Sequence, residues 1–358
     1  MTERSRGPSP AKVRGARLTD LAALGELSRL SHSADGRDGS VRSLGLPVSA
    51  SQVSVFSLFR LPLGAFQPHD QLYVYEEDRR LAGLLRVERD AHRDEWTIVE
   101  LDAIGQFQAG DIRFRLVQHL LRDGSKRGAA RFHVACADSG GNVELFMQAG
   151  FARYGEERIL YRPPERPLPP VLRMVEASET GIRPAAPFDA LALSRLYAAA
   201  TPQPVARLEA YRLPDWERQG AGWGIPRSSL TPILRFADVE AFVQERPEGD
   251  GAELAAFAQV GVAKEEQPHY LRIIALPGHD VSALVRFGLG VIAERTNSRS
   301  GGRGHSHEHG VISPVRTYES PVDRRLEEVG FGSIATVSLL MKETLIRVAE
   351  PALVPAIR

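Results

Sequence analysis

A predicted β-strand carries the two carboxylates best placed to accept a proton. Glu100 lies in an apolar run, residues 96–104, and Glu95 directly precedes that run. If Glu100 points into a cleft, burial raises the pKa of its carboxyl group toward the range that a general base needs. A buried Glu100 could then accept a proton. The alternative is an outward-facing carboxylate on an ordinary strand.

The segment after this strand has the features of an anion site. Residues 106–110 form a glycine-containing turn, and residues 111–127 show the apolar spacing of a helix. Free backbone N–H groups at a helix start, together with the helix dipole, hold phosphate groups. The residues expected to form this site are Ile104, Gln108, Ala109, Gly110, Asp111, Ile112 and Arg113.

An aspartate at the expected helix start bears on this site. Asp111 reads as the N-cap residue, where its carboxylate would accept hydrogen bonds from the same N–H groups. The carboxylate would also place a negative charge where a phosphate would bind. Arg113 and Arg115 would partly offset that charge. A helix that caps itself explains Asp111 equally well.

The order of elements in residues 96–151 resembles the GNAT (GCN5-related N-acetyltransferase) acyltransferase family. A second strand is expected at residues 131–137, and a short helix follows that ends in VELFMQAGF, residues 143–151. The resemblance implies that the turn cradles the pyrophosphate of acetyl-CoA. It also implies a glutamate base on or near the preceding strand, where Glu100 is the predicted base.

Several positions depart from the pattern of that family. Of the phosphate-turn signature, the first half matches only Gln108. The family often has a tyrosine that protonates the departing CoA thiolate, and the corresponding residues here are Phe146 and Leu326, which donate no proton. A frequent asparagine of the family falls at Ser139 and Glu319.

An internal repeat divides the chain into two similar halves. Asp20 and Asp189 are 169 residues apart, and so are Asp111 and Asp280. The Gly-Phe pairs that begin at residues 150 and 330 are 180 residues apart. The difference falls on a glycine- and histidine-rich loop, residues 298–309, which the first half lacks. A constant offset that changes at one loop indicates duplication followed by insertion.

The repeat predicts an α/β (α+β) fold with two tandem GNAT-like domains, each a mixed central sheet with helices on both faces. A proline-rich linker, residues 162–170, separates the halves, and the predicted domains are residues 1–171 and 172–358. Strands are expected at residues 72–76, 81–89, 96–104, 131–137, 241–245, 254–262, 270–276 and 311–318. Helices are expected at residues 20–31, 111–127, 188–199, 280–296 and 321–329.

Composition limits the range of partners. The 358 residues contain 45 Lys and Arg and 45 Asp and Glu, so no net charge favours nucleic acid or an anionic membrane. The single cysteine, Cys136, reads as a small core residue, and no apolar run is long enough to cross a membrane. We expect a cytoplasmic protein without nucleic-acid or membrane partners; a homodimer stays open.

Other residues could line sites but have simpler explanations. His305, His307 and His309 have the composition of a metal-binding loop, yet a solvated loop is favoured and no metal is required. Trp216 and Trp223 could line a pocket, although packing is the more frequent use of buried tryptophan.

Two classes of function follow from the sequence. The first is a GNAT-type N-acetyltransferase that moves an acetyl or acyl group from acetyl-CoA to an amine of a small molecule or peptide, with the activity in the N-terminal half. The second is a catalytically silent tandem GNAT fold that serves as a binding or dimerisation scaffold, since a fold alone does not settle function.

Overall fold

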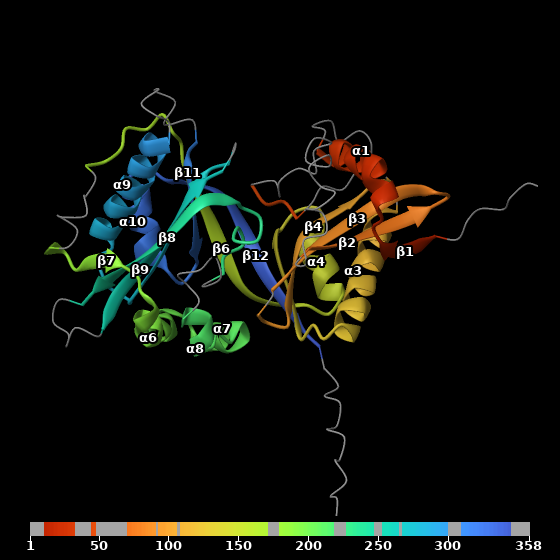
Figure 1. The fold of residues 1–358 in the computed structure, drawn as a ribbon. Coiled ribbons are helices and arrows are strands. Elements are labelled where there is room, and N and C mark those ends of the chain that lie inside the picture. Colours follow the sequence, from red (N-terminus) through yellow and green to blue (C-terminus); the bar gives the residue numbers. More distant parts are fainter. Residues whose placement is uncertain are drawn as a thin grey trace, which may run out of the picture.

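The computed structural model describes ten segments of the chain, and all of its strands join in one sheet. The described segments are residues 11–32, 44–47, 70–90, 92–105, 108–170, 179–217, 227–246, 253–264, 267–299 and 309–344. Twelve strands lie in the order β1-β2-β3-β4-β5-β12-β6-β11-β10-β9-β8-β7. The sheet therefore continues from one half of the molecule into the other (Figure 1).

The first half of the chain follows the predicted order of elements. Its elements are β1 (Lys12–Gly15), η1 (Leu18–Asp20), α1 (Leu21–His32), β2 (Asp70–Glu77), β3 (Arg80–Arg89), β4 (Glu95–Ala103), α3 (Ala109–Lys126), β5 (Arg131–Ala137), α4 (Asn142–Gln148) and β6 (Ala152–Arg162).

The second half repeats this order, and two short helices are described between its first long helix and its hairpin. Its elements are β7 (Ile182–Pro184), η3 (Pro187–Asp189), α6 (Ala190–Ala200), α7 (Gln203–Glu209), α8 (Leu213–Glu217), β8 (Phe236–Glu245), β9 (Leu254–Ala263), β10 (His269–Ala275), α9 (Ser282–Arg299), β11 (Val311–Arg316), α10 (Ser320–Glu328) and β12 (Gly332–Glu343).

The last strand of each half pairs with strands of the other half. β12 lies between β5 and β6 and is antiparallel to both, while β6 pairs with β11. Both strands run between the two groups of helices in Figure 1. The sequence reading did not predict β6 or β12. The predicted domain boundary at residue 171/172 stays a prediction, and residues 171–178 lie outside the described segments.

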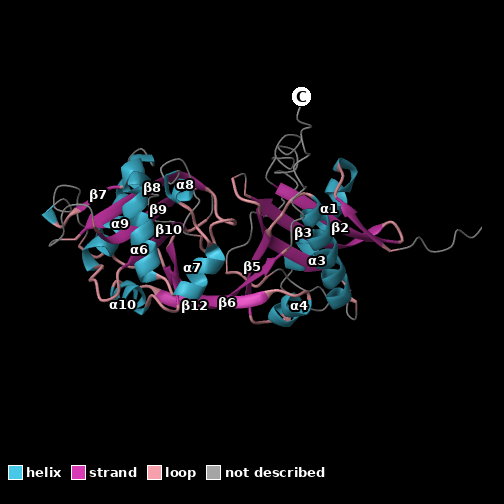
Figure 2. Ribbon diagram, turned by 90° about the horizontal axis from the view of Figure 1, so that it is seen from below, coloured by secondary structure: helices cyan, strands magenta, loops and turns pink. Residues whose placement is uncertain are grey.

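Helices cover both faces of the sheet, as predicted. In the first half α3 and α4 pack on one face, and α1 packs on the other face through Leu24 and Leu27. In the second half α9 and α10 pack on one face, and α6 and α8 on the other (Figure 2).

An identical cluster of ion pairs confirms the duplication. In the first half Arg14 contacts Asp20 and Glu76, each at 2.6 Å. In the second half Arg183 contacts Asp189 at 2.8 Å and Glu245 at 2.7 Å. Each of the three residues is 169 positions from its counterpart. The cluster ties the first helix of each half to the edge of the sheet.

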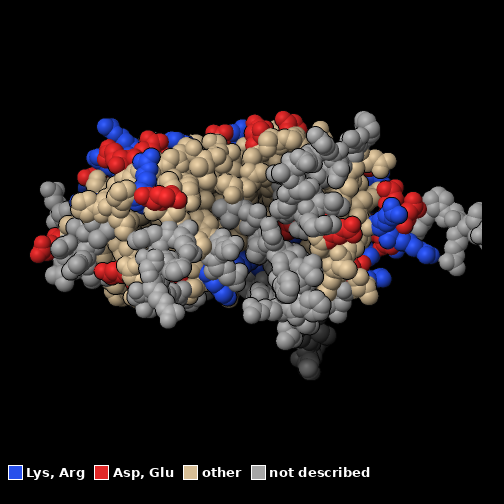
Figure 3. Space-filling model, turned by 90° about the horizontal axis from the view of Figure 1, so that it is seen from above, with Lys and Arg blue, Asp and Glu red and all other residues tan. Residues whose placement is uncertain are grey.

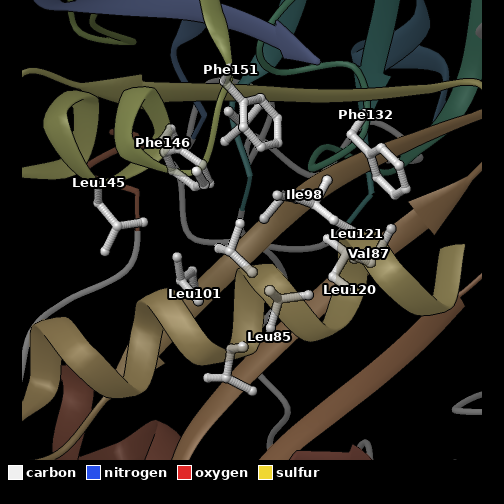
Figure 4. Close-up of a cluster of buried hydrophobic side chains, with 14 of the residues drawn as sticks. Leu85, Val87, Ile98, Leu101, Leu120, Leu121, Phe132, Leu145, Phe146 and Phe151 are labelled. Atoms are coloured by element: carbon white, nitrogen blue, oxygen red, sulfur yellow. The ribbon is translucent and has the colours of Figure 1, made fainter. Parts of the chain in front are cut away.

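The core of the first half lies between α3 and the sheet. Leu120 of α3 packs with Leu85, Leu101 and Phe132 of the strands, as the close-up in Figure 4 shows. Gly83 permits this approach, because a Cβ atom at that position would lie 2.5 Å from Cγ2 of Ile112. The spacing of apolar residues in residues 111–127 therefore predicted the correct buried face.

Charges of both signs are mixed over the surface. Figure 3 shows Lys and Arg side chains lying beside Asp and Glu side chains on the face in view. Among the described residues, none of the helices is long and apolar enough to cross a membrane.

Candidate functional site

Two parallel strands of the first half separate along their length. β4 and β5 pair from Glu95↔Arg131 to Ile98↔Val134, yet β4 continues to Ala103 and β5 to Ala137. The pairing of β3 with β4 skips Val99, which forms a bulge. We call the space between the unpaired ends the β4–β5 fork.

The helix α3 starts beside the wide end of the fork, and its start corrects a prediction. The helix begins at Ala109, after the N-cap residue Gln108, whose side chain makes no cap hydrogen bond. Asp111 lies in the first turn, where its 55% exposed side chain pairs with Arg115 at 2.7 Å. The prediction that Asp111 is the N-cap is wrong, because its carboxylate is directed along the helix to the residue four positions on.

The residues predicted to bind the cofactor divide into exposed and buried groups. Gln108, Gly110 and Asp111 are exposed at the helix start. Ala109 and Ile112 are buried in the core, and Ile104 packs against the cluster under α1. The exposed and the buried side chains point in different directions and could not contact one ligand together. Backbone groups would therefore have to supply the contacts at this turn. Gln106 and Phe107, also in the predicted turn, lie outside the described residues.

Arg113 lies in the protein interior and corrects a second expectation. Its guanidinium donates a hydrogen bond to Oδ1 of Asn142, the first residue of α4. Burial lowers the pKa of Arg113, and the negative charge of Asp102 opposes that shift. Arg113 therefore bridges the ends of β4 and β5 and does not offset the charge of Asp111 at the turn.

Glu100 lies on the face of β4 opposite α3 and is buried, as its predicted role requires. Its Oε2 atom accepts a hydrogen bond from Nε of Arg86 on the neighbouring strand, at 3.2 Å. Residues three positions apart on a regular strand face opposite sides. The extra residue at the Val99 bulge shifts the alternation by one position, so Glu100 lies on the same face as Thr97. The role of Glu100 as a base stays a prediction.

A cavity of about 490 Å³ lies between the two halves. Thr97, His133 and Ala135 line it from the first half, at the closed end of the fork. Residues 227–229 and 231–236 of the second half form the opposite wall. Its volume falls in the range of small-molecule sites.

Glu95 organises the charged side chains next to this cavity. Its carboxylate lies 2.7 Å from Nη2 of Arg93, 3.2 Å from Nη1 of Arg227 and 3.4 Å from Nε2 of His133. Burial alone would raise the pKa of Glu95, but the interaction with the neighbouring His133 and the charges of Arg227 and Arg93 outweigh it and lower the pKa to about 2.

His133 is neutral at physiological pH for a related reason. Burial lowers the pKa of its imidazole, and the charge of Arg227 adds to that shift, whereas Glu95 opposes it. The sequence reading named Glu95 but missed His133 and Arg227. His133 could have been found from the alternation of β5, because it shares a face with Arg131 and Ala135.

A second buried network fixes the opposite wall of the cavity. Nη2 of Arg316, on β11, lies 2.9 Å from Oε1 of Glu209 and from the backbone oxygen of Arg227. Nε of Arg316 lies 3.1 Å from Oε2 of Glu157 on β6. Arg93 of the first half also donates to the backbone oxygen of Glu209 at 2.5 Å. These contacts hold the two halves together around the cavity.

The corresponding fork of the second half is filled by an ion pair. β10 and β11 pair only at His269↔Val311 and Tyr270↔Ile312. Nη1 of Arg272 donates to the backbone oxygens of Ile273 and Pro314, and both terminal nitrogens lie 2.7 Å from Glu319. Backbone acceptors of both strands are therefore already used.

The helix start of the second half also differs from that of α3. Asp280 accepts hydrogen bonds from the backbone nitrogen of Ser282 at 3.1 Å and from its hydroxyl at 2.6 Å. The helix α9 begins at Ser282, two residues later than predicted. The side chain of Asp280 therefore accepts a backbone N–H group at the start of its helix, whereas Asp111 pairs with Arg115.

The remaining predicted positions have structural explanations. Cys136 is buried, and burial raises the pKa of its thiol to about 12. Trp216 packs against Tyr197 and Tyr211. Trp223, His305 and His307 lie outside the described residues. Among the residues that are described, no group of three or more His, Cys, Asp or Glu side chains could hold a metal ion.

Comparisons with known proteins identify the fold. No protein-family model and no curated protein matches the sequence. A tandem GNAT protein from the clavulanic acid biosynthesis pathway has 15% identity and a TM-score of 0.53, covering 93% of this chain and 98% of that one. A GCN5-related N-acetyltransferase from Sphaerobacter thermophilus has 15% identity and a TM-score of 0.52, covering 93% and 95%. The chain has the tandem GNAT fold.

Proposed function

We propose that this protein is an N-acyltransferase that transfers an acetyl or acyl group from acetyl-CoA to an amine of a small molecule or peptide. The proposal rests on the tandem GNAT fold together with one observation, the uncapped start of α3 beside the β4–β5 fork. We assign the activity to the first half of the chain.

We assign the pyrophosphate to the start of α3. Among the described residues, the N-cap side chain of Gln108 makes no cap hydrogen bond to this 18-residue helix, and Asp111 is turned toward Arg115. Gly110 leaves the backbone open, since a Cβ atom there would meet nothing within 4 Å. Backbone N–H groups and the helix dipole are then available to an anion. In the second half Asp280 occupies the equivalent position.

The transfer would proceed by direct attack. The amine nitrogen attacks the carbonyl carbon of the thioester, the C–N bond forms, and the C–S bond breaks with its electron pair on sulfur. The proton of the amine passes to Glu100, directly or through water. Phe146 is buried against Phe151 with a ring separation of 5.3 Å, so the thiolate would take its proton from solvent.

A scaffold without acyl transfer is the second candidate, and one feature favours it. The wide end of the β4–β5 fork is occupied, because Arg113 contacts Asn142 and the backbone nitrogen of Ala137 donates to the oxygen of Leu44 at 2.7 Å. A cofactor arm entering the fork would have to displace these groups. Failure to bind acetyl-CoA would support this second function.

A charge placed at the helix start tests the proposal. We expect Gly110→Glu to weaken acetyl-CoA binding by about two- to fivefold, since a charge at a helix end contributes roughly 0.3 to 1 kcal/mol at low salt. Gly110→Gln, of equal size, should bind like the wild type. Isothermal titration of the whole protein at two salt concentrations measures both, and added salt should reduce the difference.

Thiol release from acetyl-CoA then measures transfer, with little background because Cys136 is buried. Equal affinity of the Gly110→Glu and Gly110→Gln variants would reject the assigned anion site. Absence of acetyl-CoA binding by the wild type would reject the transferase in favour of the scaffold.

A further inference from the structure

The cavity between the halves opens on the face of the sheet opposite α3. Thr97, His133 and Ala135 line it, whereas the neighbouring Trp96, Phe132 and Cys136 are buried in the core under α3. Ile98 and Val134, the last pair before the strands separate, also border the cavity. A group that reaches the fork from the side of α3 would therefore meet a molecule held in this cavity.

One end of the cavity offers hydrogen-bond acceptors. Nε2 of His133 lies 3.4 Å from Oε2 of Glu95 but forms no hydrogen bond, so a ring nitrogen of the imidazole is left for a ligand. The hydroxyl of Thr97 and the carboxylate of Asp90 border the same end, and both contact Arg227.

The other end of the cavity is apolar. Ala135, Leu234 and Leu339 line it and belong to one buried hydrophobic cluster. Leu46 and Phe236 are partly buried against the same cluster and also line the cavity. A ligand that fits both ends has a polar donor at one end and an apolar body at the other.

The geometry points to this cavity as the acceptor site, for a small primary amine with an apolar body. The N–H groups of the amine are held by His133 and Thr97, and the body packs against the cluster around Ala135. This inference rests on the proposed transfer and adds the class of acceptor to it. Because residues 227–229 and 231–236 form the opposite wall, the second half of the chain supplies part of the site.

The length of the apolar body provides a test that needs no variant. Each methylene buried in an apolar site contributes about 0.8 kcal/mol, so affinity should rise about fourfold per methylene from n-butylamine to n-hexylamine. The compound 1,6-diaminohexane places a second ammonium group against the apolar wall and should bind at least tenfold more weakly than n-hexylamine. Isothermal titration of the full-length protein without acetyl-CoA measures both.

A matched pair of variants locates the binding. Ala135→Leu adds bulk inside the cavity and should weaken n-hexylamine binding by about tenfold or more. Ala335→Leu adds the same bulk to the same hydrophobic cluster at a residue that does not line the cavity, and should leave the affinity unchanged. Acetyl-CoA affinity should be the same in both variants, because the start of α3 is on the opposite face.

The outcomes separate this inference from the proposed transfer. Binding of n-hexylamine with the expected dependence on length, but without thiol release from acetyl-CoA, would support the site and reject the transferase. Thiol release with equal use of n-hexylamine and 1,6-diaminohexane would reject the site. An Ala135→Leu protein that is folded by circular dichroism and binds n-hexylamine normally would also reject it, and so would absence of binding by every amine in the series.

Discussion

The substitution Leu340→Ala should destabilise both halves of the chain, although the residue lies near the end of the sequence. Leu340 is fully buried on β12 and packs in the core of the first half with Leu116 and Leu120. Truncation of a buried leucine to alanine costs about 2 to 5 kcal/mol. Domains have a total stability of only about 5 to 15 kcal/mol, so this loss is a large fraction of it.

The exchanged strands predict one cooperative unfolding transition. β12 connects β5 of the first half to β6, and β6 connects to β11 of the second half, so neither half keeps its central pairings when the other unfolds. Trp96 reports on the first half and Trp216 on the second. Urea unfolding of proteins that retain one of these tryptophans should give coincident midpoints, and Leu340→Ala should shift both equally.

Leu120→Ala is the matched control, because it truncates a fully buried leucine of the same cluster on α3, which is not exchanged. Its loss should be of the same size, and both tryptophans should again report one transition. Two separate midpoints, with Leu340→Ala moving only the transition of Trp96, would refute the coupling of the halves through the sheet.

Two further predictions concern protons. Glu100→Gln should abolish thiol release while acetyl-CoA affinity is kept, because the amide preserves shape but takes no proton; unchanged turnover would remove Glu100 from the mechanism. Stability should fall as the pH is lowered below about 6.5, where unfolded His133 binds a proton that the folded state, with its lowered pKa, rejects. Glu95, with its pKa near 2 and facing Arg227, adds a loss below about pH 4.5. Urea midpoints against pH measure this, and in His133→Gln the first loss should be smaller but not absent, because burial also lowers the pKa of His119 and of His279.

Local sequence patterns predicted the strands whose apolar side chains pack against elements close to them in the sequence. β4 was expected at residues 96–104 and lies at Glu95–Ala103. β6 was missed because it carries several charged residues, which read locally as an exposed segment. Glu157 of β6 is nevertheless fully buried, since Arg316 and Ser229 pair with it from residues far along the chain. Such long-range compensation has no local signal.

The position of Arg113 was available from the sequence. Ala109, Leu116 and Leu120 lie on the buried face of α3, and Arg113 falls on the same stripe, four residues after Ala109 and three before Leu116. The prediction that Arg113 lies at the phosphate turn was based on its residue type and ignored its spacing along the helix. Its partner Asn142 could not be predicted, because α4 reaches the end of the fork only through the fold of the intervening strand.

The second half of the chain has a role in the site even where its own fork is filled. Arg227 contacts Glu95 of the first half through its side chain and Arg316 of the second half through its backbone oxygen, so it joins the two networks around the cavity. A loss of either network would change the shape of the cavity but not the start of α3. In the proposed function one half holds the cofactor while both halves enclose the acceptor, and changes in acceptor preference should then map to residues 227–229 and 231–236.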